Sequence, residues 1–196
     1  MTVVAIDGPA GAGKSTVARA LARAHGFGYL DTGAMYRAVA LSGRDDVSAL
    51  RIELNDGRVL LDGEDVTEAI RTPRVSEAAS RVASRPEVRK ALVAKQQEVI
   101  ARGDWVADGR DIATVVAPDA ELKVFLTATP EERARRRAAE LGLPVEQVLA
   151  EQDERDARDA GHGRSISAPA PGAVELDTTG LSVDEVVARI REMLGS

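Results

Sequence analysis

The stretch that decides the fold is Gly8-Pro9-Ala10-Gly11-Ala12-Gly13-Lys14-Ser15-Thr16, which follows directly on the apolar run at 3–6. It matches the phosphate-binding loop (P-loop) pattern G-x-x-x-x-G-K-[ST] at every defined position. A loop of this kind turns its backbone N–H groups toward one anion, and glycine adopts the required conformations at little steric cost. We therefore expect these residues to bind the phosphates of a nucleoside triphosphate.

Two side chains of the loop complete the expected phosphate site. Lys14 brings a positive charge to the β- and γ-phosphates, and the Ser15 hydroxyl is the expected ligand of Mg²⁺. The helix that begins near Gly13 adds free N–H groups and its dipole to the same anion. ATP and Mg²⁺ are therefore the expected cofactors. The competing interpretation is a chance match in a glycine-rich turn, and the strand before and helix after the loop argue against it.

The composition is typical of an enzyme built as one domain. Of the 196 residues, 44% are hydrophobic, which is ample for a core. The net charge of −6 argues against a nucleic-acid-binding protein, whose phosphate contacts require a basic surface. The chain contains no cysteine and no run of apolar residues long enough to span a membrane. We expect a cytoplasmic monomer with neither a nucleic-acid nor a membrane partner.

Strands and helices are expected to alternate along most of the chain. Short apolar runs predict buried strands, and segments with apolar residues on one side predict helices. This alternation indicates an α/β fold with a parallel central sheet and helices on both faces. The expected strands are 2–6, 28–31, 105–107, 122–126 and 174–176. The expected helices are 14–24, 34–42, 73–83, 87–101, 145–159 and 182–194, together with one that begins at 130 and breaks at Gly142 and Pro144.

The segment from Arg44 to Thr67 has a different character. The segments 51–54 and 58–61 flank an Asp-Gly turn, which is typical of a β-hairpin, and a further short strand is expected at 65–66. A small antiparallel insertion is therefore expected between helices of the main body.

A cluster of arginines on one predicted helix narrows the function further. Arg133, Arg136 and Arg137 are spaced by three and four residues, so they project from one face, whereas Arg135 points elsewhere. The helix leads into an interrupted segment, which would allow a mobile lid to carry arginines to a transferring phosphoryl group. A solvated helix face is the alternative that the spacing leaves open.

The chain resembles the bacterial cytidylate kinases, which are nucleoside monophosphate kinases, from its first strand to its last helix. The resemblance implies a three-layer P-loop kinase domain over 1–196, with a monophosphate-binding insertion at 43–101 and a short lid at 138–154. The matching blocks are 7–16, 30–37, 61–66, 70–72, 78–80, 108–111, 155–156, 158–159 and 176–178.

The resemblance implies which residues hold the phosphate of the acceptor. Thr32 and Arg37 would do so together with Arg110, and a hydroxyl and a bidentate guanidinium suit the geometry of a monophosphate. From the residues alone, a helix cap for Thr32 and a surface position for Arg37 remain open.

The resemblance also implies that Ser80, Arg89 and Asp111 read the base. Cytosine presents an N4 amine beside the N3 and O2 acceptors, so a carboxylate can accept from N4 while an arginine donates to the other edge. Uracil reverses this pattern at two positions and would leave buried groups unpaired. CMP and dCMP are therefore the expected acceptors.

Further roles follow from the same resemblance. Asp108 would order the waters of Mg²⁺ or the acceptor, and its alternative is a carboxylate that stabilises a turn. Arg155 and Asp159 would contact the ribose, and their alternative is an ion pair one helical turn apart. His162 stands where family members commonly carry an arginine, which leaves the preference between CMP and dCMP open.

The implied reaction is phosphoryl transfer from ATP to CMP or dCMP. The attacking phosphate oxygen is already anionic, so positioning and neutralisation replace a strong base. The groups expected to neutralise charge are Lys14, Arg110, Arg133, Arg136 and Arg137. Three alternatives stay open: a kinase for another monophosphate or for shikimate, a non-enzymatic nucleotide switch, and an inactive relative that only binds.

Overall fold

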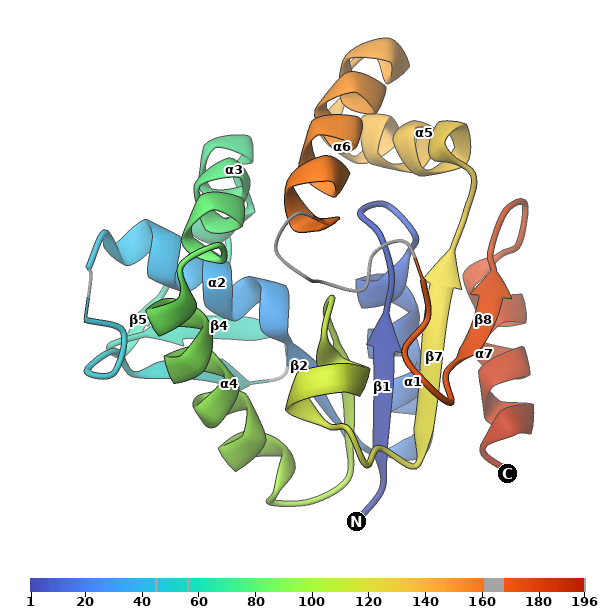
Figure 1. The fold of residues 1–196 in the computed structure, drawn as a ribbon, viewed down its shortest axis with the longest axis horizontal. Coiled ribbons are helices and arrows are strands. Elements are labelled where there is room, and N and C mark those ends of the chain that lie inside the picture. Colours follow the sequence, from blue (N-terminus) through green and yellow to red (C-terminus); the bar gives the residue numbers. More distant parts are fainter. Residues whose placement is uncertain (45, 56, 161–167, 196) are drawn as a thin grey trace.

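The main body of the chain is a five-stranded sheet in the order β2-β6-β1-β7-β8. The computed structural model describes residues 1–44, 46–55, 57–160 and 168–195. Every neighbouring pair of strands in this sheet is parallel, which confirms the predicted fold class (Figure 1). The strands are β1 (Val3–Asp7), β2 (Gly28–Asp31), β6 (Trp105–Asp108), β7 (Leu122–Thr127) and β8 (Val174–Asp177).

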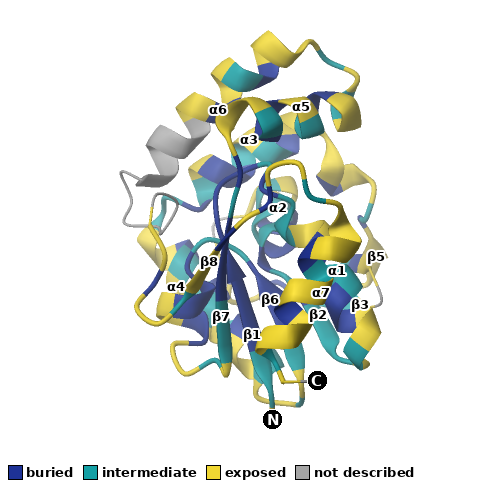
Figure 2. Ribbon diagram, turned by 90° about the vertical axis from the view of Figure 1, so that its right-hand side faces the viewer, coloured by how far each residue is buried: buried dark blue, intermediate teal, exposed yellow. Residues whose placement is uncertain are grey.

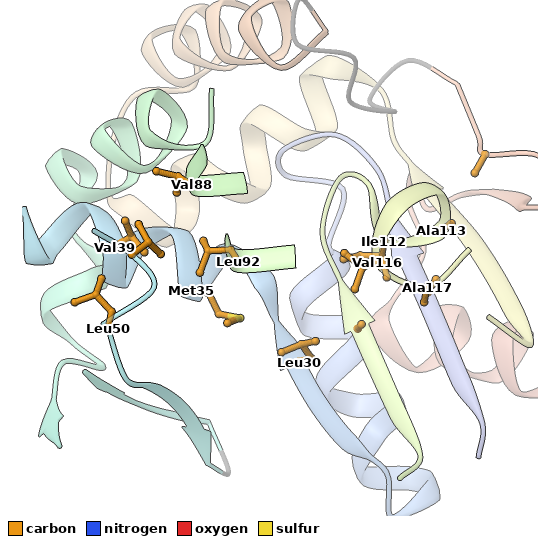
Figure 3. Packing of buried hydrophobic residues seen from close by; sticks show 14 residues of the cluster. Leu30, Met35, Val39, Leu50, Val88, Leu92, Ile112, Ala113, Val116 and Ala117 are labelled. Atoms are coloured by element: carbon orange, nitrogen blue, oxygen red, sulfur yellow. The ribbon is translucent and has the colours of Figure 1, made fainter. Parts of the chain in front are cut away.

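Two helical layers enclose the sheet (Figure 2). One face carries α1 (Lys14–His25) and α7 (Val183–Met193), and Leu21 and Ile190 are fully buried there. The other face is covered by α2 (Thr32–Ser42), α4 (Pro86–Ile100) and a π-helical turn, η2 (Ile112–Val116). Their core, drawn in Figure 3, includes Leu30, Met35, Val88, Leu92, Ile112 and Val116. No described helix is long and apolar enough to cross a membrane.

Helix starts follow local capping chemistry, and three of them differ from the prediction: those of α2, of α4, and of α7, which begins at Val183 after the cap residue Ser182. α2 begins at Thr32 instead of residue 34, because the Asp31 carboxylate accepts a hydrogen bond from Ala34 N at 2.7 Å and caps the helix. Asp31 is therefore the cap, and the helix-cap interpretation of Thr32 is wrong. α4 begins at Pro86 itself, since a first-turn proline lacks only an N–H that has no helical partner.

The predicted insertion is a three-stranded antiparallel sheet in the order β3-β4-β5. Its strands are β3 (Ile52–Asn55), β4 (Arg58–Leu61) and β5 (Glu64–Asp65), the last one residue earlier than expected. Asp62 and Gly63 both have positive φ, 52° and 89°, and form the turn between β4 and β5. A short η1 (Ala69–Arg71) and α3 (Pro73–Val82) follow.

A helical hairpin stands above the carboxyl ends of the strands (Figure 1). α5 (Pro130–Leu141) ends at Gly142, whose φ of 67° confirms the predicted break, and α6 (Val145–Ala160) follows. Ala134, Ala138 and Val148 are buried between the two helices. This hairpin contains the segment 138–154 for which the sequence predicts a lid.

The turn η2 is an element that the sequence does not predict. Its first two N–H groups, those of Ile112 and Ala113, donate to the Asp7 carboxylate at 2.9 and 2.8 Å. Asp7 is 2% exposed, and burial raises its pKa while these two hydrogen bonds lower it. A side chain 105 residues earlier in the chain thus holds this turn at the end of β1.

Candidate functional site

The P-loop lies at the carboxyl end of β1 and leads into α1. Gly8 has φ 145°, and a Cβ there would lie 2.0 Å from the Leu126 carbonyl oxygen of β7. Gly13, with φ 87°, forms the N-cap of α1. Glycine at 8 is therefore a steric requirement of the packing against β7, in addition to a requirement of the loop conformation.

Side chains from distant segments support the backbone of this loop. Arg133 of α5 is buried and donates to the Ala10 carbonyl oxygen at 2.9 Å. Arg110 donates to the Gly8 carbonyl oxygen, and Lys14 Nζ donates to the Pro9 carbonyl oxygen at 2.7 Å. Three predicted site residues thus meet at the loop.

Asp108, at the end of β6, is the centre of a buried polar cluster. Its two carboxylate oxygens accept hydrogen bonds from Ser15 Oγ at 2.8 Å and from Tyr29 OH at 3.0 Å. The carbonyl oxygen of Asp108 accepts from Thr32 Oγ1 at 2.7 Å. Burial raises the pKa of Asp108 to about 6, the nearby Asp31 carboxylate adds to the increase, and Lys14 opposes it.

The parallel register produces this cluster. Asp108 is the partner of Ile6 on one side and of Asp31 on the other, so the carboxyl ends of β1, β6 and β2 are level. Ligands of open α/β sheets bind at this edge. Tyr29 is a member of the cluster that the sequence does not single out, because a tyrosine in a strand carries no signal of its own.

Thr32 and Arg37 lie next to this cluster on the first two turns of α2. Thr32 is buried, and a Cβ at Gly109 would come within 2.6 Å of its Oγ1, so glycine at 109 lets β6 approach α2. Arg37 Nη2 pairs with the Asp31 carboxylate at 3.1 Å. Arg37 is therefore bound to the strand end, in contrast to the open alternative of a free surface arginine.

Two of the residues predicted to read the base are in contact. Arg89 of α4 pairs with Asp111, which directly precedes η2, at 2.5 Å. Ser80 of α3 is 5% exposed, and among the described residues its Oγ has no hydrogen-bond partner. A buried hydroxyl without a partner is costly, so Ser80 is a candidate for contact with a ligand.

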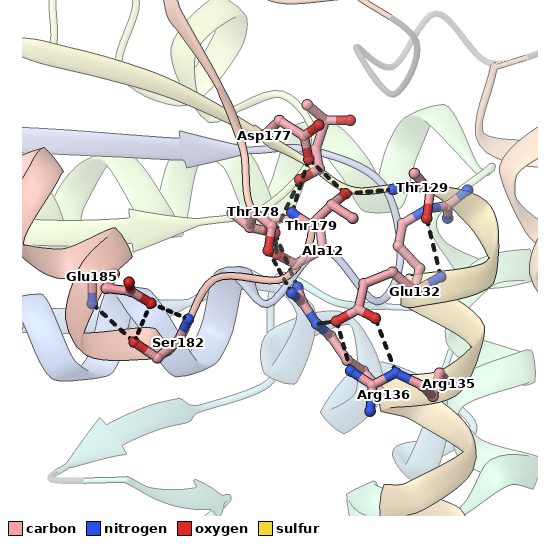
Figure 4. A network of polar contacts seen from close by, with 12 residues as sticks. Ala12, Thr129, Glu132, Arg135, Arg136, Asp177, Thr178, Thr179, Ser182 and Glu185 are labelled. Carbon is pink, nitrogen blue, oxygen red and sulfur yellow. Dashed lines mark hydrogen bonds and ion pairs between the residues drawn. The ribbon is translucent and has the colours of Figure 1, made fainter.

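The arginines of α5 make different contacts, and Figure 4 shows two of them, Arg135 and Arg136, which both pair with Glu132. Arg136 donates to Thr178 Oγ1 at 2.9 Å and to the Thr178 carbonyl oxygen at 2.6 Å, and its Nη1 lies 3.6 Å from where a Cβ at Gly13 would be. Arg137 instead pairs with Glu140 at 2.8 Å. Arg133 and Arg136 therefore reach the P-loop, whereas the contact expected of Arg137 stays a prediction.

Thr178 is a second residue to which the sequence analysis assigns no role. Its hydroxyl can donate to either of two carbonyl oxygens: that of Thr127 is 3.0 Å from Oγ1, and that of Ala12 is 3.3 Å from it. It lies just beyond β8, and through Arg136 it joins the P-loop to α5 (Figure 4). Only the sheet order, which puts β8 beside β7, brings it there.

The residues predicted to contact the ribose lie at the end of α6. Arg155 and Asp159 belong to the last turns of α6, and their side chains lie outside the described residues. His162 also lies outside them. The roles of these residues stay predictions.

Comparisons with known proteins extend this picture. A family model described as cytidylate kinase matches residues 4–195. The chain is similar to the cytidylate kinase of Solibacter usitatus (strain Ellin6076), with 50% identity over 99% of this chain and 92% of the relative. It is also similar to the cytidylate kinase of Carboxydothermus hydrogenoformans, with 50% identity over 98% of this chain and 96% of the relative.

Solved structures agree with the fold. A gluconokinase from Sinorhizobium meliloti 1021 aligns with a TM-score of 0.55 and 17% identity over 98% of this chain and 95% of its own. A shikimate kinase from Bacteroides thetaiotaomicron aligns with a TM-score of 0.51 and 15% identity over 100% of this chain and 99% of its own. At these identities the two likenesses concern the fold alone.

Proposed function

The chain belongs to the cytidylate kinase family, and on this premise we propose that it transfers the γ-phosphoryl group of ATP to CMP or dCMP. The products are ADP and CDP or dCDP. The observation that carries the proposal is a pair of groups near the carboxyl end of β6: a P-loop whose Ser15 contacts Asp108, and the Arg89–Asp111 ion pair. The first suits a triphosphate, and the second suits the edge of cytosine.

The donor end fits ATP with Mg²⁺. The glycine-rich loop from Gly8 to Gly13 and the start of α1 present backbone N–H groups, and Lys14 supplies a positive charge. Ser15 and Asp108, whose side chains are in contact, would hold the ion directly or through its waters. When bound, Mg²⁺ neutralises charge on the phosphates of the donor.

The acceptor end fits a cytidine monophosphate. Thr32, Arg37 and Arg110 would bind its phosphate. Asp111 would accept a hydrogen bond from the N4 amine, while Arg89 and Ser80 donate to the N3 and O2 edge. The existing ion pair orients Asp111, and the ligand would give the Ser80 hydroxyl the partner that it lacks among the described residues.

The chemistry requires positioning more than proton transfer. An oxygen of the CMP phosphate forms the new bond to the γ-phosphorus, and the bond from this phosphorus to the β-phosphate oxygen breaks. The nucleophile is anionic, so neutralisation by Lys14, Arg110, Arg133 and Arg136 is the main contribution of the protein. Arg137 would join them if the hairpin at 138–154 closes as a lid, which would also exclude water from the donor.

A coupled assay of ADP release tests the proposal. The enzyme is supplied with ATP–Mg²⁺ and, one at a time, CMP, dCMP, UMP, AMP, GMP and shikimate. Selective turnover of CMP and dCMP is expected, and Lys14→Met serves as the control without phosphoryl transfer. Turnover of a different acceptor would overturn the base assignment, and ATP binding without any turnover would favour a binding protein.

A further inference from the structure

A small cavity of about 30 Å³ lies between α1, β2, the start of α2 and the antiparallel insertion. Its lining is strongly basic. Arg19 comes from α1, Arg37 from α2, Arg58 from β4 and Arg71 from η1, and Asp31 is the one carboxylate in the lining. Leu54, Val59 and Ile70 form an apolar wall.

The guanidinium groups of this cavity are incompletely paired. The Nε atoms of Arg19 and Arg37 are buried and have no hydrogen-bond partner in the described part of the chain. Asp31, which is partly buried, pairs with Arg37, and Arg71 is 3.7 Å from the exposed Glu68. Arg58 interacts with the exposed Asp65, so Asp31 is the one carboxylate of a lining that holds four arginines. Buried donors without acceptors and an excess of positive charge both favour an anionic ligand.

The cavity borders the edge strand β2, and neither Arg89 nor Asp111 of the candidate base site is in its lining. Tyr29, in the cavity wall, packs with the cluster beneath α1 and α7, and Arg19 lies over its ring at 5.5 Å. Arg89 extends from α4, whose Val88 and Leu92 pack on the other face of the sheet. Arg37 is the residue of the proposed acceptor site that also borders the cavity.

We propose that this cavity is a second anion site, which binds the phosphate group of a small molecule and is separate from the donor and acceptor sites. Arg19 donates to the phosphate at the base of the cavity, while Arg37 stays paired with Asp31 and serves the acceptor. Arg58 and Arg71, which are exposed at its rim, close around it.

Side-chain NMR of arginine Nε–Hε groups tests the proposal with inorganic phosphate as the probe. A non-hydrolysable ATP analogue with Mg²⁺ first fills the P-loop, and Arg19→Lys assigns the Arg19 signal. We expect a saturable shift of this signal with phosphate, and no such shift with chloride at matched ionic strength. The double variant R58Q/R71Q should bind phosphate about tenfold more weakly, because each charge-assisted hydrogen bond contributes at this scale.

Arg81→Gln is the matched control, because Arg81 pairs with Glu77 on the exposed side of α3 and does not line the cavity. This variant should leave the midpoint of the phosphate titration unchanged. CMP is then added at saturation, and the Arg19 shift should persist. No saturable shift, an equal midpoint in the double variant, or loss of the shift with CMP would each overturn the proposal, whichever acceptor the turnover assay identifies.

Discussion

The donor end and the acceptor end of the candidate site are held in different ways. Around the P-loop, Arg110, Arg133 and Lys14 all donate to carbonyl oxygens of the loop, and β7 packs directly against Gly8. At the acceptor end, Arg89 pairs with Asp111, and the buried Ser80 hydroxyl has no partner among the described residues. The donor end is therefore pre-organised by the fold, whereas the acceptor end has hydrogen-bonding capacity left for a ligand.

The largest expected effect separates the two ends by charge reversal. Asp111→Lys should lower kcat/KM for CMP by about 10⁴-fold, because a lysine cannot accept from N4 and would face Arg89. Affinity for ATP at the P-loop should stay unchanged, as measured by calorimetric titration. Unchanged turnover of CMP would remove Asp111 from the base site.

The next prediction concerns the packing of the donor end. Gly8→Ala should lower the free energy of unfolding by roughly 4 kcal/mol, because its Cβ would clash with the Leu126 carbonyl oxygen at a φ that alanine avoids. Gly43→Ala is the matched control, since Gly43 also has positive φ, 62°, but open space around it; a cost of about 1 kcal/mol is expected. Equal losses in urea unfolding would show that φ alone matters.

The third prediction uses the raised pKa of Asp108. A carboxyl group with a pKa of about 6, above its ordinary value near 4, holds a proton in the folded chain that the unfolded chain releases. The contribution of this group to the free energy of unfolding is therefore complete below pH 4 and is lost as the pH rises through 6. The difference in the free energy of unfolding between Asp108→Asn and wild type should therefore shift by about 3 kcal/mol in favour of the variant between pH 4 and pH 7.

Unfolding free energies of both proteins across this pH range measure the change. The pH dependence of the difference is informative even if asparagine pairs less well with Ser15 and Tyr29. A difference that does not vary with pH would show that Asp108 titrates as in an unfolded chain.

The smallest expected effect is at the acceptor end. Ser80→Ala should raise KM for CMP about tenfold and leave the KM for ATP unchanged, because it removes one hydrogen bond to the base. The free energy of unfolding should stay equal or increase, since the hydroxyl is buried without a described partner. Ser84→Ala, which removes a bond to the Ser80 carbonyl oxygen, is the control and should keep the wild-type KM.

The sequence by itself determined the P-loop, the alternation of strands and helices, the antiparallel insertion and the break at Gly142. These features are encoded locally: glycines where φ is positive, apolar runs where a strand is buried, and proline at a helix start. Where local chemistry was misread, as at the start of α2, the competing feature was also local, the Asp31 cap.

Only the tertiary structure decided which side chains meet. Ser15, Tyr29 and Thr32 contact Asp108 across 76 to 93 residues of sequence, and the parallel register that levels β2, β6 and β1 brings them together. The turn η2 depends in the same way on the Asp7 carboxylate. Strand order and register result from the packing of the whole core, so no local pattern of residues could reveal these partners.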